Sequence, residues 1–195
     1  NDNVPVFVSN PASAAENQIA IGCVVVTDSD LMNPAPTPAP NCGIASGLTL
    51  SITGDNLQVN SVGYLSFISA PDFETKSSYT GTIIASDGTN TSTKNITVNV
   101  TNVNEVPQIS ALSSTQLSDE NQVSVVTVSA SDPDASTTLA YSLSGTDSSL
   151  FAISSSGVIT FSSAPDYETP GDADGDNNYQ INVVVSDGSL SVTQA

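Results

Sequence analysis

The sequence lacks histidine and tryptophan, and it carries little positive charge. Its 195 residues include two basic residues, Lys76 and Lys94, against 20 acidic ones, for a formal net charge of −18. Without histidine there is no Ser–His or Cys–His pair for nucleophilic catalysis and no histidine-based zinc site. Because polyanions would be repelled, we expect no nucleic acid and no anionic membrane surface as a partner. The charge favours cations as ligands.

Long apolar segments and cysteines are also scarce. The longest apolar run, Ile19–Val26, is too short to span a bilayer, so we expect no direct membrane insertion by this fragment. The sequence starts at Asn1 without a signal-peptide pattern, which is typical of a fragment of a longer protein. Cys23 and Cys42 bracket a proline-rich insertion. A disulfide across this loop is favoured over two free thiols; it would contribute about 3 kcal/mol and indicate an extracellular, cell-surface or secreted protein.

What the sequence does contain is an internal repeat with a period of about 100 residues. Five landmarks occur twice in the same order. They are Asn1–Pro5 and Asn104–Pro107, Ala15–Asn17 and Asp119–Asn121, Thr27–Asp30 and Ser131–Asp134, Ala70–Glu74 and Ala164–Glu168, and Ala85–Gly88 and Val185–Gly188. The spacing differs only where one copy carries an insertion, and such insertions belong in surface loops.

Between the landmarks, apolar and polar residues alternate. Ile96, Val98 and Val100 share one face of a segment, which is the pattern of a half-buried strand. About seven such strands per repeat, separated by turn residues and without a helix, predict an all-β fold. We expect two tandem seven-stranded Greek-key β-sandwiches of the immunoglobulin-like type. The predicted domains are residues 1–103 and residues 104–195.

The acidic residues gather at the landmarks. Six lie there in each repeat and two lie in the joining segments, so 14 of the 20 are accounted for. Carboxylates held close together repel one another and raise one another's pKa. A hard divalent cation relieves that repulsion, and Ca²⁺ matches a donor set of Asp, Glu, Asn and backbone carbonyl oxygens. The sequence therefore predicts calcium binding.

The ordered motifs resemble those of cadherin repeats, in the divergent form of bacterial surface proteins. They are Glu16-Asn17, Asp28-x-Asp30, Asp72-x-Glu74, Ala85-x-Asp87 and the linker Asn102–Pro107. Their counterparts recur in the second repeat. The resemblance covers the whole chain. It implies a cadherin-like sandwich for each repeat and calcium at the joint between successive repeats.

The resemblance also implies the ligands of that joint. They are Glu16, Asp72 and Glu74 from repeat one, Asn102, Asn104 and Glu105 from the linker, and Asp132, Asp134 and Asp187 from repeat two. Seven of these nine are carboxylates, and three Ca²⁺ ions, the number in the family, would nearly balance their charge. The linker departs from the family pattern: Asn102 stands where Asp is usual, Glu105 replaces a second Asp, and a residue before Pro107 is missing.

Two further acidic sets are expected to bind calcium weakly or not at all. They are the half-sites at the two ends of the chain, formed by Asn1, Asp2, Asn3, Asp28, Asp30 and Asp87, and by Glu120, Asp166 and Glu168. A separate run contains Asp172, Asp174 and Asp176 around a glycine, like the first half of a calcium loop but without the closing Glu. A solvated acidic turn and an extra Ca²⁺ site both remain open for this run.

These features predict a calcium-binding extracellular repeat in cell adhesion, with Ca²⁺ making the joint rigid. Its partner would be another copy of itself or a cell-surface protein. One alternative is a carbohydrate-binding module of a secreted polysaccharide-degrading system, although aromatic residues are only 5% of the chain. Another is a passive spacer in a large surface adhesin. We expect no enzymatic activity, because carboxylate pairs such as Asp72 and Glu74 recur at the end of each repeat.

Overall fold

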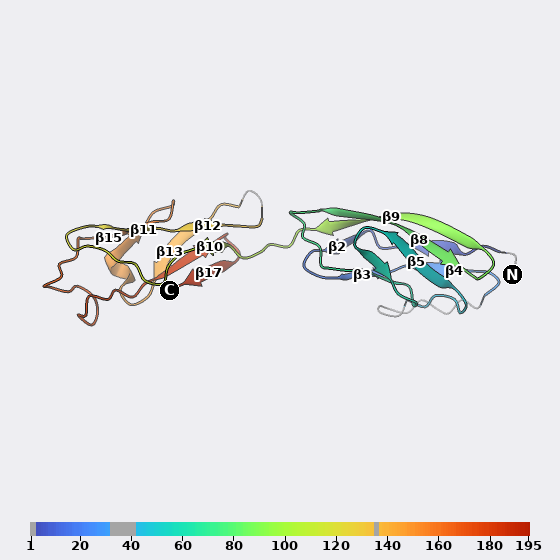
Figure 1. Cartoon of the computed structure of the whole chain (residues 1–195), viewed down its shortest axis with the longest axis horizontal. Helices are drawn as coiled ribbons and strands as arrows, with labels where there is room; N and C mark the ends of the chain where they lie inside the picture. Colours follow the sequence, from blue (N-terminus) through green and yellow to red (C-terminus); the bar gives the residue numbers. More distant parts are fainter. Residues whose placement is uncertain (1–2, 32–41, 135–136) are drawn as a thin grey trace. The chain divides into compact units, whose positions relative to one another are not determined.

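The computed structural model describes residues 3–31, 42–134 and 137–195 (Figure 1). The chain divides into two compact units, Asn1–Val103 and Asn104–Ala195. Strands dominate both units, so the predicted all-β class is confirmed. The predicted half-site residues Asn1 and Asp2, and most of the proline-rich insertion, lie outside the described residues.

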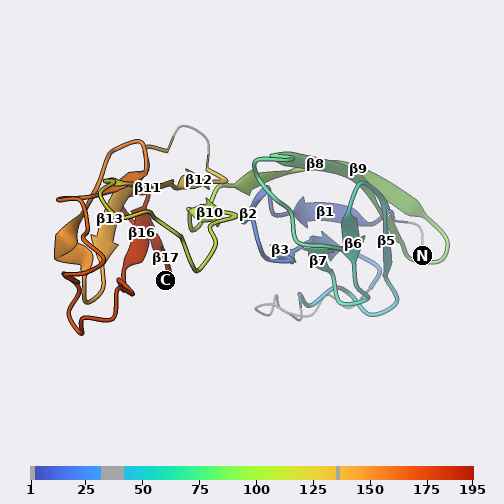
Figure 2. The ribbon, with the colours of Figure 1, turned by 60° about the vertical axis from the view of Figure 1, so that its left-hand side comes forward.

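Unit 1 is a sandwich of two sheets. Its strands are β1 (Val6–Ser9), β2 (Ser13–Ala15), β3 (Ala20–Cys23), β4 (Val25–Thr27), β5 (Thr49–Gly54), β6 (Leu57–Val59), β7 (Tyr64–Phe67), β8 (Ser78–Ser86) and β9 (Thr91–Thr101). One sheet has the order β2-β9-β8-β5. The other joins β1-β4 to β3-β7-β6, because only Val24 separates β3 from β4. Figure 2 shows β8 and β9 above the layer with β3, β6 and β7. Counting β1 with β2 and β3 with β4, the unit has the predicted seven strands.

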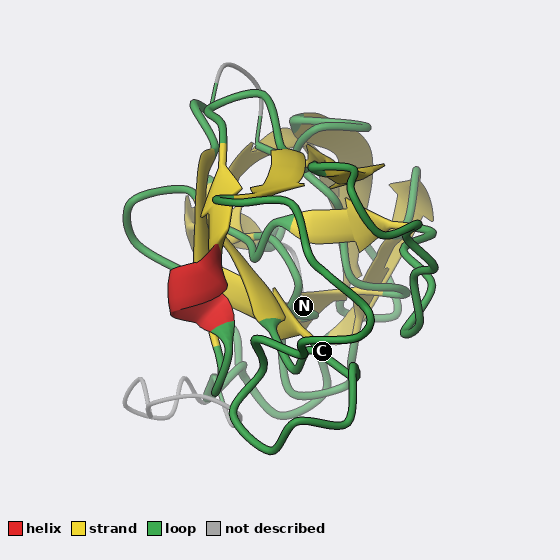
Figure 3. Ribbon diagram, turned by 90° about the vertical axis from the view of Figure 1, so that its left-hand side faces the viewer, coloured by secondary structure: helices red, strands yellow, loops and turns green. Residues whose placement is uncertain are grey.

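Unit 2 repeats this plan with shorter strands. They are β10 (Gln108–Ser110), β11 (Ser124–Thr127), β12 (Ser129–Ser131), β13 (Ala140–Ser144), β14 (Phe151–Ile153), β15 (Val158–Phe161), β16 (Asn182–Ser186) and β17 (Ser191–Gln194). One sheet is β13-β16-β17, and the other joins β10-β12 to β11-β15-β14. The helix drawn in Figure 3 is a 3-10 turn, Ser148–Leu150. Within the described residues, no helix has the length and apolar character that crossing a membrane requires.

Each unit encloses its own core. In unit 1 the predicted face of β9 is buried: Ile96, Val98 and Val100 pack in one cluster with Phe67 and Tyr79, whose rings meet edge to face at 5.1 Å. In unit 2 the rings of Phe151 and Phe161 lie 4.4 Å apart, and the ring of Tyr179 packs edge-on against both. Edge-to-face packing of this kind adds to the free energy of burying the rings.

The backbone explains why two of the landmarks recur together. Asn17 and Asn121 have φ angles of 60° and 61°, in the left-handed region that Asn tolerates better than most residues. Their N–H groups donate to the carbonyl oxygens of Pro71 and Pro165, respectively. The Glu-Asn motif and the Ala-Pro-Asp motif are therefore two sides of one hydrogen-bonded turn.

The predicted disulfide between Cys23 and Cys42 is confirmed. Cys42 is fully buried, and its N–H donates to the carbonyl of Val62 in the turn before β7. The bridge and this hydrogen bond therefore tie Cys42 to β3 and to the turn before β7. Chain-entropy arguments give such a bridge about 3 kcal/mol of stabilisation.

Gly157, in the turn before β15, gives a test of the backbone packing in unit 2. Its φ is 80°, and a Cβ there would lie 2.3 Å from the carbonyl oxygen of Val128. Gly188 has a φ of 99°, but a Cβ there would meet nothing within 4 Å. We expect Gly157→Ala to lower the free energy of unfolding by about 3 kcal/mol and Gly188→Ala by about 1 kcal/mol. Urea denaturation measures both, and equal losses would contradict the close approach.

Candidate functional site

Three carboxylates converge at one end of unit 1. Glu16, Asp72 and Glu74 each place a carboxylate oxygen within 4.8 Å of the others, and we call them the unit 1 carboxylate group. Glu16 follows β2 and is only 2% exposed, whereas Asp72 and Glu74 are exposed on the loop after Pro71. The structure thus brings together the three ligands predicted from repeat one.

Glu16 links this loop to the last residues of the unit. Its Oε2 accepts the N–H of Phe73 at 2.8 Å, and its Oε1 accepts the N–H of Val103 at 2.7 Å. Its own N–H donates to the carbonyl of Thr101. Asn102, another predicted ligand, is exposed and lies in the sequence between Thr101 and Val103. The end of β9 is therefore held beside the unit 1 carboxylate group.

Asp72 is held in its ionised form. The backbone N–H of Thr75 donates to its Oδ1 at 3.0 Å, and the Thr75 hydroxyl donates to its Oδ2 at 2.9 Å. These two hydrogen bonds lower the pKa of Asp72 below its ordinary value. The basic residue nearest in sequence, Lys76, forms an ion pair with Asp55, which is outside the group. Asp72 therefore carries a full negative charge at neutral pH.

A second group forms at the start of unit 2. It contains Glu105, Asp132, Asp134 and Asp187, and we call it the unit 2 carboxylate group. Asp134 donates its N–H to Asp132 Oδ1 at 2.9 Å and accepts the N–H of Glu105 on Oδ2 at 2.8 Å. The other oxygen of Asp132, Oδ2, is buried and has no hydrogen-bond partner among the described residues. A buried carboxylate oxygen in that state is an open position for a cation.

Asp187 closes this group from the β16–β17 turn. Its Oδ1 accepts the N–H groups of Ser189 and Leu190 at 2.5 and 2.6 Å, and its Oδ2 accepts the side-chain amide of Asn104 at 2.7 Å. The hydrogen bond from Leu190, then those from Asn104 and Ser189, lower the pKa of Asp187. The five predicted ligands from the second half of the chain are thus connected by hydrogen bonds or are neighbours in the sequence. They are Asn104, Glu105, Asp132, Asp134 and Asp187.

Unit 1 has the same arrangement at its own beginning. The N–H and the side-chain amide of Asn3 donate to Asp30 at 2.8 and 2.7 Å, and the N–H of Asp30 donates to Asp28. By its hydrogen bond to Asp134, Glu105 corresponds to Asn3. Glu105 thus brings a carboxylate to a position where the first repeat has an amide.

The predicted half-site in unit 2 is also assembled. Carboxylate oxygens of Glu120, Asp166 and Glu168 lie within 4.8 Å of one another, and all three residues are exposed. The N–H of Tyr167 donates to Glu120 at 3.1 Å, as Phe73 does to Glu16. The local turn is therefore the same as in unit 1, but its glutamate is open to solvent.

The acidic loop after Gly171 is organised by two buried aspartates. Asp172 accepts the N–H groups of Asp176 and Asn177. Asp147, which looks like an ordinary turn residue in the sequence, is 4% exposed and accepts the N–H groups of Ala173 and Gln180 at 2.8 and 2.7 Å. Sequence reasoning missed Asp147, because nothing in its neighbourhood distinguishes it from other Gly/Asp turns.

Comparison with solved structures identifies the architecture. The EC22-24 fragment of mouse cadherin-23 matches 99% of this chain at TM-score 0.55 and 22% identity, and EC1-2 of human protocadherin-24 matches 97% at TM-score 0.60 and 21% identity. EC1-4 of Drosophila N-cadherin matches 97% at TM-score 0.55 and 17% identity. The two units have the cadherin-repeat fold.

The matches differ in how much of each relative they include. The chain spans 63% of the mouse cadherin-23 fragment, less than two thirds of it, 92% of the protocadherin-24 fragment and 47% of the N-cadherin fragment. No protein-family model matches the sequence, and no curated protein matches it. The cadherin-like fold is therefore established by three-dimensional similarity at low sequence identity.

Asp174 offers a test of electrostatic repulsion in the acidic loop. A hydrogen bond shared with the Asp172 side chain and the negative charge of Asp176 raise the pKa of Asp174. A raised pKa means that the ionised form is disfavoured in the folded state, so at neutral pH its charge opposes folding. We expect Asp174→Asn to raise the melting temperature at pH 7 in EDTA, as measured by circular dichroism.

The same variant separates the two interpretations of the loop. If the loop is a solvated turn, the gain in melting temperature should persist in calcium. If the loop binds Ca²⁺, calcium should stabilise the parent protein more than the variant, and the gain should shrink or reverse. A variant that is less stable than the parent in EDTA at pH 7 would contradict the repulsion.

Proposed function

We propose that the chain is a calcium-binding pair of extracellular repeats from an adhesion protein, in which Ca²⁺ fixes unit 1 to unit 2. One observation carries the proposal. The unit 1 carboxylate group is hydrogen-bonded through Glu16 to Val103, the last residue of unit 1. The unit 2 carboxylate group is hydrogen-bonded to Asn104 and Glu105, the first residues of unit 2. The residues that anchor the two groups are thus consecutive in the sequence, from Val103 to Glu105.

The donor atoms suit calcium. The two groups present carboxylate oxygens from seven side chains, and Asn102 and Asn104 can add amide or carbonyl oxygens. Hard oxygen donors in such numbers, without thiolate or imidazole, favour Ca²⁺ over transition metals. The buried Oδ2 of Asp132 supports the proposal, since a cation would satisfy it. When bound, Ca²⁺ would neutralise charges that otherwise repel one another across the joint.

An extracellular setting is consistent with this chemistry. Extracellular calcium modules bind with dissociation constants of about 10⁻⁴ to 10⁻³ M, so they are filled outside cells. The Cys23–Cys42 disulfide belongs to oxidising compartments. We therefore propose that the joint is rigid at extracellular calcium concentrations and flexible without calcium.

For the partner, we propose another copy of this protein or a cell-surface protein. Polysaccharide binding receives little support, because sugar platforms need several exposed rings. All aromatic side chains of the sequence lie in the described residues, and among them Tyr167 alone is strongly exposed, at 66%. We propose binding rather than catalysis, since the Asp72/Glu74 pair has a structural counterpart in Asp166/Glu168.

Calcium titration tests the proposal. We expect Ca²⁺ to raise the melting temperature and to narrow the distance distribution from small-angle X-ray scattering, because neutralised carboxylates let the joint close. Asp134→Asn should weaken binding by about tenfold or more in titration calorimetry, since the site loses a charged ligand. Asp55→Asn is the matched control, because it removes the same charge from the β5–β6 turn and should leave calcium affinity unchanged.

Two results would contradict the proposal. A scattering profile that is the same in calcium and in EDTA would exclude a calcium-rigidified joint. Equal calcium affinity for the parent and Asp134→Asn would exclude the unit 2 carboxylate group as the site. Sedimentation in calcium then tests the partner: a concentration-dependent dimer supports a second copy, and a monomer at all concentrations directs the search to a different cell-surface protein.

A further inference from the structure

The sequence contains three Asp-Gly pairs, and the structure holds them in different ways. They are Asp87-Gly88, Asp174-Gly175 and Asp187-Gly188. An Asp-Gly pair can rearrange to isoaspartate without an enzyme, because glycine has no Cβ that would keep its nitrogen away from the aspartate carboxyl group. In isoaspartate the main chain runs through the side-chain carboxyl carbon. Since the three pairs share one chemistry, their surroundings decide which of them reacts.

The rearrangement depends on the positions of two groups. The backbone nitrogen of the glycine must come within bonding reach of Cγ of the preceding aspartate, and its N–H must be able to lose a proton. Small displacements of reacting atoms cost large factors in rate, so a carboxylate or an N–H group that is held elsewhere by hydrogen bonds reacts slowly. The hydrogen bonds of each pair therefore predict how fast it rearranges.

Asp87-Gly88, in the turn between β8 and β9, is restrained at both reacting groups. Asp87 Oδ1 accepts the N–H groups of Thr89 and Asn90 at 2.7 and 2.6 Å. The N–H of Gly88 donates to Ser86 Oγ at 3.2 Å. The carboxylate and the attacking nitrogen are thus each bound to another group.

Asp187-Gly188, in the turn between β16 and β17, has the same restraints. Asp187 Oδ1 accepts the N–H groups of Ser189 and Leu190 at 2.5 and 2.6 Å. The N–H of Gly188 donates to Ser186 Oγ at 3.0 Å. In both turns, the donors to the aspartate lie two and three positions after it in the sequence. We therefore expect both pairs to resist rearrangement.

Asp174-Gly175 lacks both restraints. Both residues are exposed in the acidic loop, and we call them the loop tip. The N–H groups two and three positions further on, those of Asp176 and Asn177, donate to Asp172 instead. Within the parts of the chain that the structure describes, the N–H of Gly175 has no hydrogen-bond partner. The hydrogen bond between the side chains of Asp174 and Asp172 needs a proton that two carboxylates share, so it is lost when both ionise.

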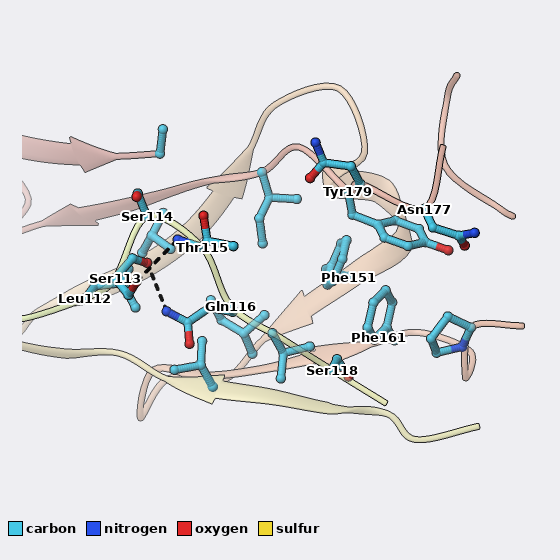
Figure 4. A pocket seen from close by; sticks show the side chains of 18 of the residues that line it. Leu112, Ser113, Ser114, Thr115, Gln116, Ser118, Phe151, Phe161, Asn177 and Tyr179 are labelled. Atoms are coloured by element: carbon cyan, nitrogen blue, oxygen red, sulfur yellow. Dashed lines mark hydrogen bonds between the residues drawn. The ribbon is translucent and has the colours of Figure 1, made fainter. Parts of the chain in front are cut away.

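The segments on either side of the loop tip are anchored. Asp147 accepts the N–H of Ala173 before the tip and the N–H of Gln180 after it, at 2.8 and 2.7 Å. Figure 4 shows the side chains of Asn177 and Tyr179 near one another, and the ring of Tyr179 packs in the aromatic cluster of unit 2. The loop tip is therefore an exposed, unrestrained pair between two fixed ends.

We propose that Asp174 is a modification site at which isoaspartate forms, and that hydrogen bonds protect Asp87 and Asp187 from the same reaction. The Gly175 nitrogen bonds to Cγ of Asp174, and one carboxyl oxygen leaves as water with the carboxyl proton and the N–H proton. Water then opens the five-membered imide. Cleavage of the new bond restores aspartate, whereas cleavage of the original peptide bond gives isoaspartate. No oxidant, reductant or cofactor takes part.

Isoaspartate at this position would disturb the buried part of the loop. It lengthens the main chain by one atom directly before Asp176 and Asn177, so their N–H groups would move away from Asp172. Asp172 is only 8% exposed, and a buried carboxylate that loses its donors destabilises the fold. The modification would thus make the stability of unit 2 depend on the age of the protein. The inference does not depend on calcium, and its test is run in EDTA.

Incubation of the full chain at physiological temperature and near-neutral pH tests the assignment. Peptide mapping by mass spectrometry, with a protein isoaspartate methyltransferase as the label, measures the product at each pair. We expect isoaspartate at Asp174 to exceed that at Asp87 and Asp187 by at least about tenfold. In concentrated guanidinium chloride, which removes the hydrogen bonds, the three pairs should react at similar rates. Equal yields in the folded protein, or a difference that persists in guanidinium chloride, would overturn the proposal.

Two variants at the loop tip supply matched controls. Asp174→Glu keeps the negative charge but would have to close a larger ring, so the methylation signal should be lost. Asp174→Asn keeps the shape and offers a neutral amide, from which ammonia leaves, so isoaspartate should form several-fold faster than in the parent. A methylation signal that survives Asp174→Glu at full size would place the product elsewhere and overturn the proposal. So would an Asp174→Asn variant that reacts no faster than the parent.

The aged protein tests the effect on unit 2. We expect the isoaspartate form of the parent to melt about 4 °C or more below the fresh protein in EDTA, because Asp172 loses its donors. Asp174→Glu, incubated in the same way, should keep its melting temperature. Treatment of the aged parent with the methyltransferase and its methyl donor returns isoaspartate to aspartate and should restore the loss. An aged parent that carries isoaspartate at Asp174 and melts like the fresh protein would overturn the link to Asp172.

Discussion

Hydrogen bonds from backbone N–H groups to carboxylates hold the ends of both units in shape. Glu16 accepts Phe73 and Val103, and Asp187 accepts Ser189 and Leu190. In each case a loop folds around an acidic side chain rather than around an apolar one. Hydrogen bonds to charged acceptors are stronger than those between neutral groups, so these loops are well fixed despite their short strands. The positions of the acids follow from the positions of the loops.

This arrangement also places like charges close together, and the apolar core of each unit does not reduce that repulsion. The same hydrogen bonds that keep Asp72 and Asp187 ionised also hold them near other acids, where like charges repel. With two lysines in the chain, and Lys76 engaged by Asp55, the protein has little positive charge of its own to place there. Under the proposed function, a bound cation relieves this repulsion. Stability of the loops and affinity for a cation would then be two consequences of one arrangement.

The sequence predicts most of this, and the failures have physical causes. Period-two alternation at Ile96–Val100 and the repeated landmarks are local patterns, so the sandwiches, the disulfide and the acidic clusters could be foreseen. The division of the second strand into β3 and β4 at Val24 depends on the different strands that the two halves pair with, β7 and β1, which is not a local property. The buried role of Asp147 depends on Gln180, 33 positions away.

Comparison of the two units separates what is local from what is not. Asn17 and Asn121 have φ angles of 60° and 61°, and Glu16 and Glu120 accept the backbone N–H groups of equivalent residues, Phe73 and Tyr167. The turn is therefore encoded by its own residues. The burial of the glutamate differs between the two turns, because Glu16 is 2% exposed and Glu120 is open to solvent. Because a buried carboxylate needs hydrogen-bond partners, the residues at the end of β9 matter to Glu16, which accepts the N–H of Val103 and donates its own N–H to Thr101.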